Sequence, residues 1–85
     1  MDKHDQLFMQ LLYLFHHTAM QGLGKIKNPV SDKIERELPQ AQQAIEMLEM
    51  LKEKTKGNIS EAMGKVLDGF LTEVRLNYID EVNKK

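Results

Sequence analysis

The sequence contains no cysteine and no tryptophan, and it has only two prolines in 85 residues. Without cysteine, neither a disulfide nor a thiolate-bound metal ion can reinforce the fold. A chain of this length forms one domain with a thin core, because so small a domain buries only about 60–65% of the surface that its unfolded chain exposes. Close packing or self-association must supply the remaining stability.

The chain also lacks an excess of charge of either sign. It has 12 basic and 13 acidic residues and a formal net charge of −1, which gives no electrostatic reason to expect nucleic acid or an anionic membrane as a partner. The apolar run 7–15 is far shorter than the ~20 residues that span a bilayer. Asp2 and Asp5 offset Lys3 where a signal peptide would be positive. We therefore expect a soluble, cytoplasmic protein.

Three segments have the apolar periodicity of α-helices, at about residues 4–22, 39–56 and 61–82. The first is apolar around much of its circumference, so it is expected to be buried on more than one side. We assign its core-facing stripe to Leu7, Leu11, Leu14, Phe15, Thr18 and Gly22, widened by Phe8, Leu12 and Ala19.

A segment without regular periodicity, at about residues 23–38, joins the first two helices. Pro29 favours an extended conformation at Asn28, and Ser31 is suited to cap a short helical turn through Ile34. A connection of this length is usually functional or exchanged between chains. We expect its apolar residues to hold it against the core, namely Leu23, Ile26, Val30 and Ile34.

The second and third helices each present one apolar stripe. Pro39 suits the first turn of the second helix. Gly64 and Gly69 lie inside the third helix, where each costs about 1 kcal/mol relative to alanine, and we expect them to admit another backbone. The sequence therefore predicts an all-α fold in which these two helices form an antiparallel hairpin and the first helix packs across it. The two stripes comprise Ala41, Ala44, Ile45, Leu48, Leu51 and Thr55, and then Met63, Leu67, Phe70, Leu71, Val74 and Tyr78.

The stretch EKTKGNIS between these helices has two interpretations. As a turn, Gly57 takes a left-handed conformation, Ser60 caps the third helix, and the Thr55 hydroxyl finds the carbonyl of Leu51. As a binding loop, amides near Ser60 and nearby lysines hold an anion or small ligand. The residues of this second interpretation are Lys54, Thr55, Lys56 and Asn58, together with Arg75 from the third helix.

The apolar first helix predicts a homodimer. One hairpin has too little surface to cover such a helix on all sides, and an exposed apolar patch usually marks a partner site. The predicted interface residues are Phe8, Leu12, Tyr13 and Phe15. The first function that we infer is therefore a non-enzymatic, homo-oligomeric interaction module, which would also bind another protein through this helix or the long loop. The alternative is the ligand- or anion-binding protein of the turn.

Catalytic and metal-binding patterns are weak in this sequence. His16 and His17 are adjacent, so on a helix they point about 100° apart and do not share one ion. The histidines lie together in the first helix, without a supporting nucleophile–base pattern. Arg75 is placed to pair with Glu46 or Glu49 of the second helix. We expect no enzyme activity, no cofactor and no metal.

The order of these motifs resembles a small bacterial family catalogued as domain of unknown function 1844. The resemblance rests on LGKIKNP after an apolar first helix, on AQQAIEMLEMLKEKTKGNIS and on VLDGFLTEVRLNYID, and it covers about residues 7–78. Where the family has a short glycine-containing turn after its Asn-Pro, this chain has VSDKIEREL. The resemblance implies a small all-helical protein of unassigned function and carries over no catalytic residues.

Overall fold

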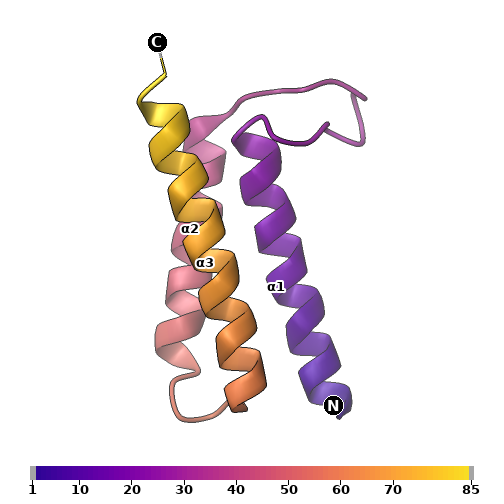
Figure 1. Cartoon of the computed structure of the whole chain (residues 1–85). Coiled ribbons are helices and arrows are strands. Elements are labelled where there is room, and N and C mark those ends of the chain that lie inside the picture. The colour runs from indigo at the N-terminus through magenta and orange to yellow at the C-terminus, as the bar shows by residue number, and fades with distance from the viewer. Residues whose placement is uncertain (1, 85) are drawn as a thin grey trace.

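The computed structural model describes residues 2–84 and consists of three α-helices that run side by side (Figure 1). These are α1 (Lys3–Gly22), α2 (Leu38–Lys54) and α3 (Glu61–Val82). The predicted all-α fold is confirmed. Helices α2 and α3 form a hairpin, and α1 lies alongside both, with more extensive contacts to α2.

The helix starts follow from local hydrogen bonding. The Asp2 carboxylate accepts a hydrogen bond from the amide of Asp5 at 2.7 Å, and the Ser60 hydroxyl accepts one from the amide of Met63 at 3.2 Å. Each side chain satisfies an amide that has no partner within the helix. Helix α2 has no such side-chain cap, and Pro39 lies in its first turn as predicted.

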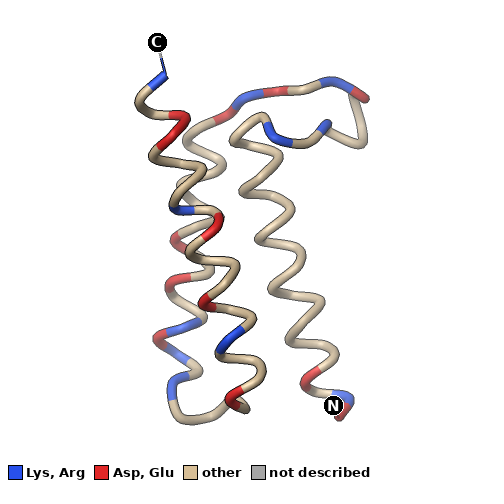
Figure 2. The backbone as a smooth tube through the Cα atoms, viewed as in Figure 1, with Lys and Arg blue, Asp and Glu red and all other residues tan. Residues whose placement is uncertain are grey.

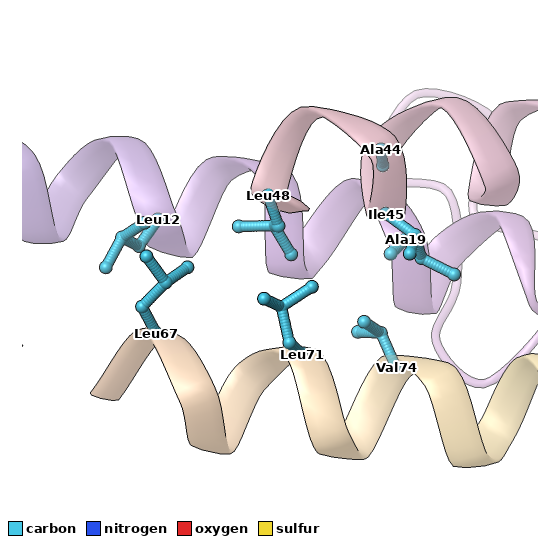
Figure 3. Packing of buried hydrophobic residues seen from close by; sticks show 8 residues of the cluster. All are labelled: Leu12, Ala19, Ala44, Ile45, Leu48, Leu67, Leu71 and Val74. Atoms are coloured by element: carbon cyan, nitrogen blue, oxygen red, sulfur yellow. The ribbon is translucent and has the colours of Figure 1, made fainter. Parts of the chain in front are cut away.

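The core lies between the three helices, and its side chains interdigitate along the bundle (Figure 3). Leu12 faces Leu67, and Leu48 points toward Leu71 at the next level. Truncation of one buried leucine to alanine typically costs about 2–5 kcal/mol. In so small a domain this is a large fraction of the total stability. The core cluster consists of Leu12, Ala19, Ala44, Ile45, Leu48, Leu67, Leu71 and Val74.

The apolar face predicted for α1 is buried in part. Leu12 and Ala19 are fully buried, and Phe8 and Phe15 pack partly buried against the core, as predicted. Leu7, Leu11 and Leu14, which we assigned to the same face, are exposed. Both sides of this face are apolar, so periodicity does not distinguish them. Ala19 and Gly22 let α1 approach α2 closely because their side chains are small or absent.

Gly22 is the point of closest approach between α1 and α2. A β-carbon at this position would lie 2.8 Å from the amide nitrogen of Ala41 and 2.9 Å from the carbonyl oxygen of Glu37. Both neighbours are backbone atoms, so neither has a side chain that rotates away. By contrast, nothing lies within 4 Å of such a carbon at Gly64 or Gly69. The close approach that we predicted for those two glycines was therefore wrong.

The connection 23–37 is a closed loop whose two ends lie together. The amide of Glu37 donates to the carbonyl of Gly22 at 2.7 Å, and Leu23 pairs with Arg36 through an isolated antiparallel bridge. The loop therefore leaves α1 and returns to α2 at nearly the same place, and it extends beyond the end of the bundle (Figure 1).

Asn28 organises the tip of this loop. Its side-chain oxygen accepts a hydrogen bond from the amide of Val30, and its carbonyl accepts one from the amide of Asp32, each at 2.8 Å. Asp32 has a φ of 58°, in the left-handed region that Asp tolerates better than most residues. This turn stands where we predicted a short helix from Ser31 to Ile34. It is stabilised by the two oxygen atoms of Asn28, which accept hydrogen bonds from the amides of Val30 and Asp32.

The apolar residues of the loop behave differently from one another. Leu23 is 1% exposed and holds the base of the loop in the core. Val30 is 94% exposed and Ile34 is 55% exposed, so the expectation that they hold the loop against the core was wrong. The loop is fixed at its base and projects at its tip.

Candidate interaction surface

A stripe of leucines lies on the outer side of α1. The side chains are exposed by 49% at Leu7, 36% at Leu11 and 58% at Leu14. The spacing of four and then three residues places all three on one face of the helix, and Thr18 continues it. We call Leu7, Leu11, Leu14 and Thr18 the outer stripe. Aligned leucines differ from scattered exposed ones, because together they form a continuous apolar patch.

The outer stripe lies in a long uncharged part of the chain. Residues 6–24 contain no aspartate, glutamate, lysine or arginine. Figure 2 shows the contrast: α1 carries charge only at its first turn, whereas α2 and α3 carry charges along much of their length. A helix face that remains exposed to solvent usually carries charged side chains. The outer face of α1 has none between its ends, so it is suited to contact another apolar surface.

A groove of about 250 Å³ between α1 and α2 adjoins the outer stripe. The Thr18 hydroxyl donates to the carbonyl of Leu14 at 2.8 Å. This hydrogen bond within the helix satisfies the hydroxyl donor, so the Thr18 side chain does not need a water molecule to accept its hydrogen bond. The groove is lined by Phe15, Thr18, Gln40, Gln43, Ala44 and Met47. It is therefore uncharged on both of its walls.

The four interface residues that the sequence predicted differ in how far they are buried. Leu12 is 0% exposed within a single chain, so it is a core residue and its assignment to an interface is corrected. Phe8 and Phe15 pack against the core and are only partly accessible. Tyr13 is 56% exposed, and its ring lies 5.4 Å from the ring of Phe70 on α3. The accessible apolar surface of α1 is thus mainly leucine.

The turn after α2 has the local structure that we predicted. Gly57 has a φ of 83°, and the Thr55 hydroxyl donates to the carbonyl of Leu51 at 2.6 Å. Helix α2 ends at Lys54, two residues before the predicted end, so Gly57 follows the helix cap by two residues. Asn58 donates its amide to the carbonyl of Thr55 and extends the turn.

A groove of about 330 Å³ adjoins this turn, and acidic side chains neutralise lysines on its walls. Lys52 pairs with Asp68 at 2.7 Å, and Lys65 approaches Glu61 at 3.5 Å. An anion in this groove would have to compete with both carboxylates. These pairs reduce the positive charge of the groove at Lys52 and Lys65, which are not the lysines of the predicted binding loop.

Arg75 lies away from the turn. Its guanidinium group pairs with Glu49 at 2.7 Å, one of the two partners that we predicted. Arg75 is 14 residues beyond Glu61, which places it about 21 Å along α3 from the turn. The five residues of the predicted ligand site are therefore not brought together. Arg75 instead lines a groove between α2 and α3 together with Tyr78 and Ile79.

The adjacent histidines have different surroundings. The His16 ring nitrogen Nε2 contacts the Glu73 carboxylate of α3, and its ring lies 4.5 Å from the ring of Phe70. His17 is exposed. Among residues 2–84, no group of three or more histidine, cysteine, aspartate or glutamate side chains is arranged to hold a metal ion.

Sequence reasoning missed an ionic cluster around Glu81. Two adjacent acidic residues near a helix end, Asp80 and Glu81, are typical of solvated charge, but Glu81 is only 6% exposed. Its carboxylate accepts hydrogen bonds from Lys84 at 2.6 Å, from Lys25 at 3.0 Å and from Arg36 at 3.1 Å. Arg36 also donates to the Glu81 backbone carbonyl at 2.6 Å. The bonds from Lys84 and Lys25 lower the pKa of Glu81 from 4.5 to about 2.

The spacing of Glu81 in the sequence indicates that its side chain is buried. It continues the core-facing spacing of α3, which runs through Leu67, Leu71, Val74 and Tyr78 in steps of four and three. An acid on a core stripe is buried only when it is paired. Two of its partners, Lys25 and Arg36, lie near the two ends of the loop, so Glu81 fixes the loop to the end of α3.

Three comparisons with known proteins complete the description. A family model described as a domain of unknown function (DUF1844) matches residues 5–80. No curated protein and no solved structure matches significantly. In the described part of the chain, no helix has both the length and the apolar character needed to cross a membrane.

Proposed function

We propose that this chain, which belongs to the DUF1844 family as its sequence motifs indicated, is a non-enzymatic interaction module that self-associates through the outer stripe of α1. The observation that carries the proposal is the alignment of three exposed leucines on an uncharged helix face. Leucines and glutamines supply contact area and hydrogen bonds, whereas acid–base chemistry needs titratable groups.

Self-association also agrees with the size of the domain. The core is thin, and no disulfide reinforces it. Burial of the outer stripe against a second copy removes apolar surface from water, at about 25 cal/mol per Å². A homodimer therefore gains stability from the same residues that give it specificity.

Leu14→Glu tests this proposal, with Leu76→Glu as its matched control. Leu14 is 58% exposed on α1 and Leu76 is 63% exposed on α3, so both substitutions place a carboxylate on an accessible helix surface. Phe15→Glu is less suitable, because Phe15 packs against the core. We expect the native protein and Leu76→Glu to be dimers in sedimentation velocity at micromolar concentration, and Leu14→Glu to be a monomer with unchanged helix content.

Two results would contradict self-association through α1. One is a native protein that sediments as a monomer at these concentrations. The other is a Leu14→Glu variant that stays dimeric while its circular dichroism is unchanged. Dissociation of Leu76→Glu in place of Leu14→Glu would move the interface to α3.

The anion-binding alternative at the turn has less support, because its five residues are not brought together: Arg75 lies about 21 Å along α3 from the turn and pairs with Glu49. A thermal-shift titration with inorganic phosphate separates the two functions. Phosphate at 100 times its Kd would stabilise the fold by roughly 2.7 kcal/mol. We expect no shift.

A further inference from the structure

We propose that two copies pack their α1 helices antiparallel, so that Leu7 of each copy enters the groove between α1 and α2 of the other. This inference rests on the proposed function and adds the arrangement of the two chains and the pocket that each leucine fills. In this proposal, α1 of a second copy of the same chain covers the outer stripe.

Charge favours a second copy over a partner with a charged surface. Residues 6–24 contain no aspartate, glutamate, lysine or arginine, and the groove walls contribute none. A charged partner surface would lose its hydration against this face without gaining a counter-charge. A copy of the same uncharged face has no such cost, and a two-fold interface requires a surface that is complementary to itself.

The spacing of the outer stripe favours the antiparallel direction. The stripe is centred between Leu11 and Leu14, so an antiparallel pair places Leu11 opposite the partner's Leu14 and Leu7 opposite the partner's Thr18. Leu11 and Leu14 of the two chains then meet, and Leu7 meets the methyl group of Thr18 at the level of the groove. In a parallel pair, leucine would meet leucine at positions 7, 11 and 14, but the partner's Thr18 in place of a leucine would lie at the groove. Antiparallel helices also place each N-terminus beside a C-terminus, which their dipoles favour.

The groove lies at the level that this register requires. Thr18 lines the groove between α1 and α2, so a leucine opposite Thr18 lies over its mouth. The groove measures about 250 Å³, with Phe15 and Met47 among its lining residues. Met47 is flexible and adapts its shape to an inserted side chain. Because the Thr18 hydroxyl already donates to the carbonyl of Leu14, a leucine placed over Thr18 does not deprive this hydroxyl of its hydrogen bond.

Cysteine cross-linking tests the arrangement directly, because the native chain has no cysteine. Three variants are needed: Leu7→Cys, Thr18→Cys and the double variant. A disulfide requires α-carbons within about 7 Å of one another. In the antiparallel pair, residues 7 and 18 of different chains are neighbours, whereas the two copies of residue 7 lie roughly 16 Å apart along the axis.

We expect the double variant to run mainly as a covalent dimer on a non-reducing denaturing gel after mild oxidation. Each single variant should remain a monomer on the same gel. Thr72→Cys on the exposed surface of α3 is the control for random collision, and it should not cross-link. Sedimentation of each reduced variant establishes that it still forms the non-covalent dimer.

The other outcomes overturn the proposal in distinguishable ways. Cross-linking of Leu7→Cys alone indicates parallel helices, which refutes the arrangement but not self-association. A dimer in which the double variant does not cross-link places the interface elsewhere. If the native protein is monomeric by sedimentation, both the proposed self-association and the antiparallel arrangement are refuted.

Discussion

At the scale of single residues, Glu81 has the widest influence, because its carboxylate joins both ends of the loop to the end of α3. Lys25 follows α1 and Arg36 precedes α2, so two segments that are distant in sequence bind one side chain. The pairing is needed because a buried carboxylate without partners is costly. Glu81 is therefore the main ionic link between α3 and the loop, beside the longer Lys25–Asp80 pair at 3.6 Å.

Glu81→Gln should release the loop and make the protein less sensitive to acid. The native carboxylate has its pKa lowered from 4.5 to about 2, so its stabilising contribution is complete above pH 4.5 and is lost as the pH falls toward 2. We expect native stability to fall over this interval and the variant to show a shallower decline from a lower starting value. Urea unfolding at several pH values between 2 and 6 measures both curves.

Asp68→Asn is the control for this change. Asp68 pairs with Lys52, but its side chain is 57% exposed, and exposed pairs contribute only about 0–1 kcal/mol. Hydrogen exchange at residues 23–37 should accelerate in Glu81→Gln and not in Asp68→Asn. Parallel acid profiles for the native protein and Glu81→Gln would show that ionisation of Glu81 does not contribute to the acid sensitivity.

At the scale of the helices, the glycines of α3 and α1 have opposite expected effects when they are replaced by alanine. Gly64→Ala and Gly69→Ala should each stabilise the protein by up to about 1 kcal/mol, because both lie in a helix with open space at the β-carbon. Gly22→Ala should destabilise it, because its β-carbon would meet two backbone atoms within 3 Å. Thermal unfolding of the three variants makes the comparison.

The sign of the change at Gly22 is the decisive result. If Gly22→Ala also raised the melting temperature, the close packing of α1 on α2 would be wrong. If Gly64→Ala and Gly69→Ala lowered it, a partner surface over α3 would be the simplest cause, since the single chain leaves room for both methyl groups.

At the scale of the whole molecule, the proposed self-association would be linked to folding stability. The outer stripe and the core stripe lie on the same helix, so dissociation of the proposed dimer would expose leucines that flank the core. We expect the melting temperature of the native protein to rise with protein concentration, because a dimer stabilises the fold by mass action. Leu14→Glu should remove this dependence. A native melting temperature that is constant over a 100-fold range of concentration would contradict the link.

The sequence alone determined the local features of this protein. The three helices, the Ser60 cap, the left-handed Gly57 and the Thr55–Leu51 hydrogen bond all followed from residues close together in the chain. Such features depend on hydrogen bonds and side-chain directions within one or two turns, which residue type and spacing specify. The family resemblance followed from the same motifs.

The tertiary structure alone decided which surfaces are inside. Two overlapping apolar stripes of α1 satisfied the same periodicity, and packing against α2 and α3 buried the one that contains Leu12. In the same way, Glu81 became buried because Lys25 and Arg36 reach it from more than 40 residues away. Periodicity identifies a face, but only packing against distant residues decides whether that face meets the core or water.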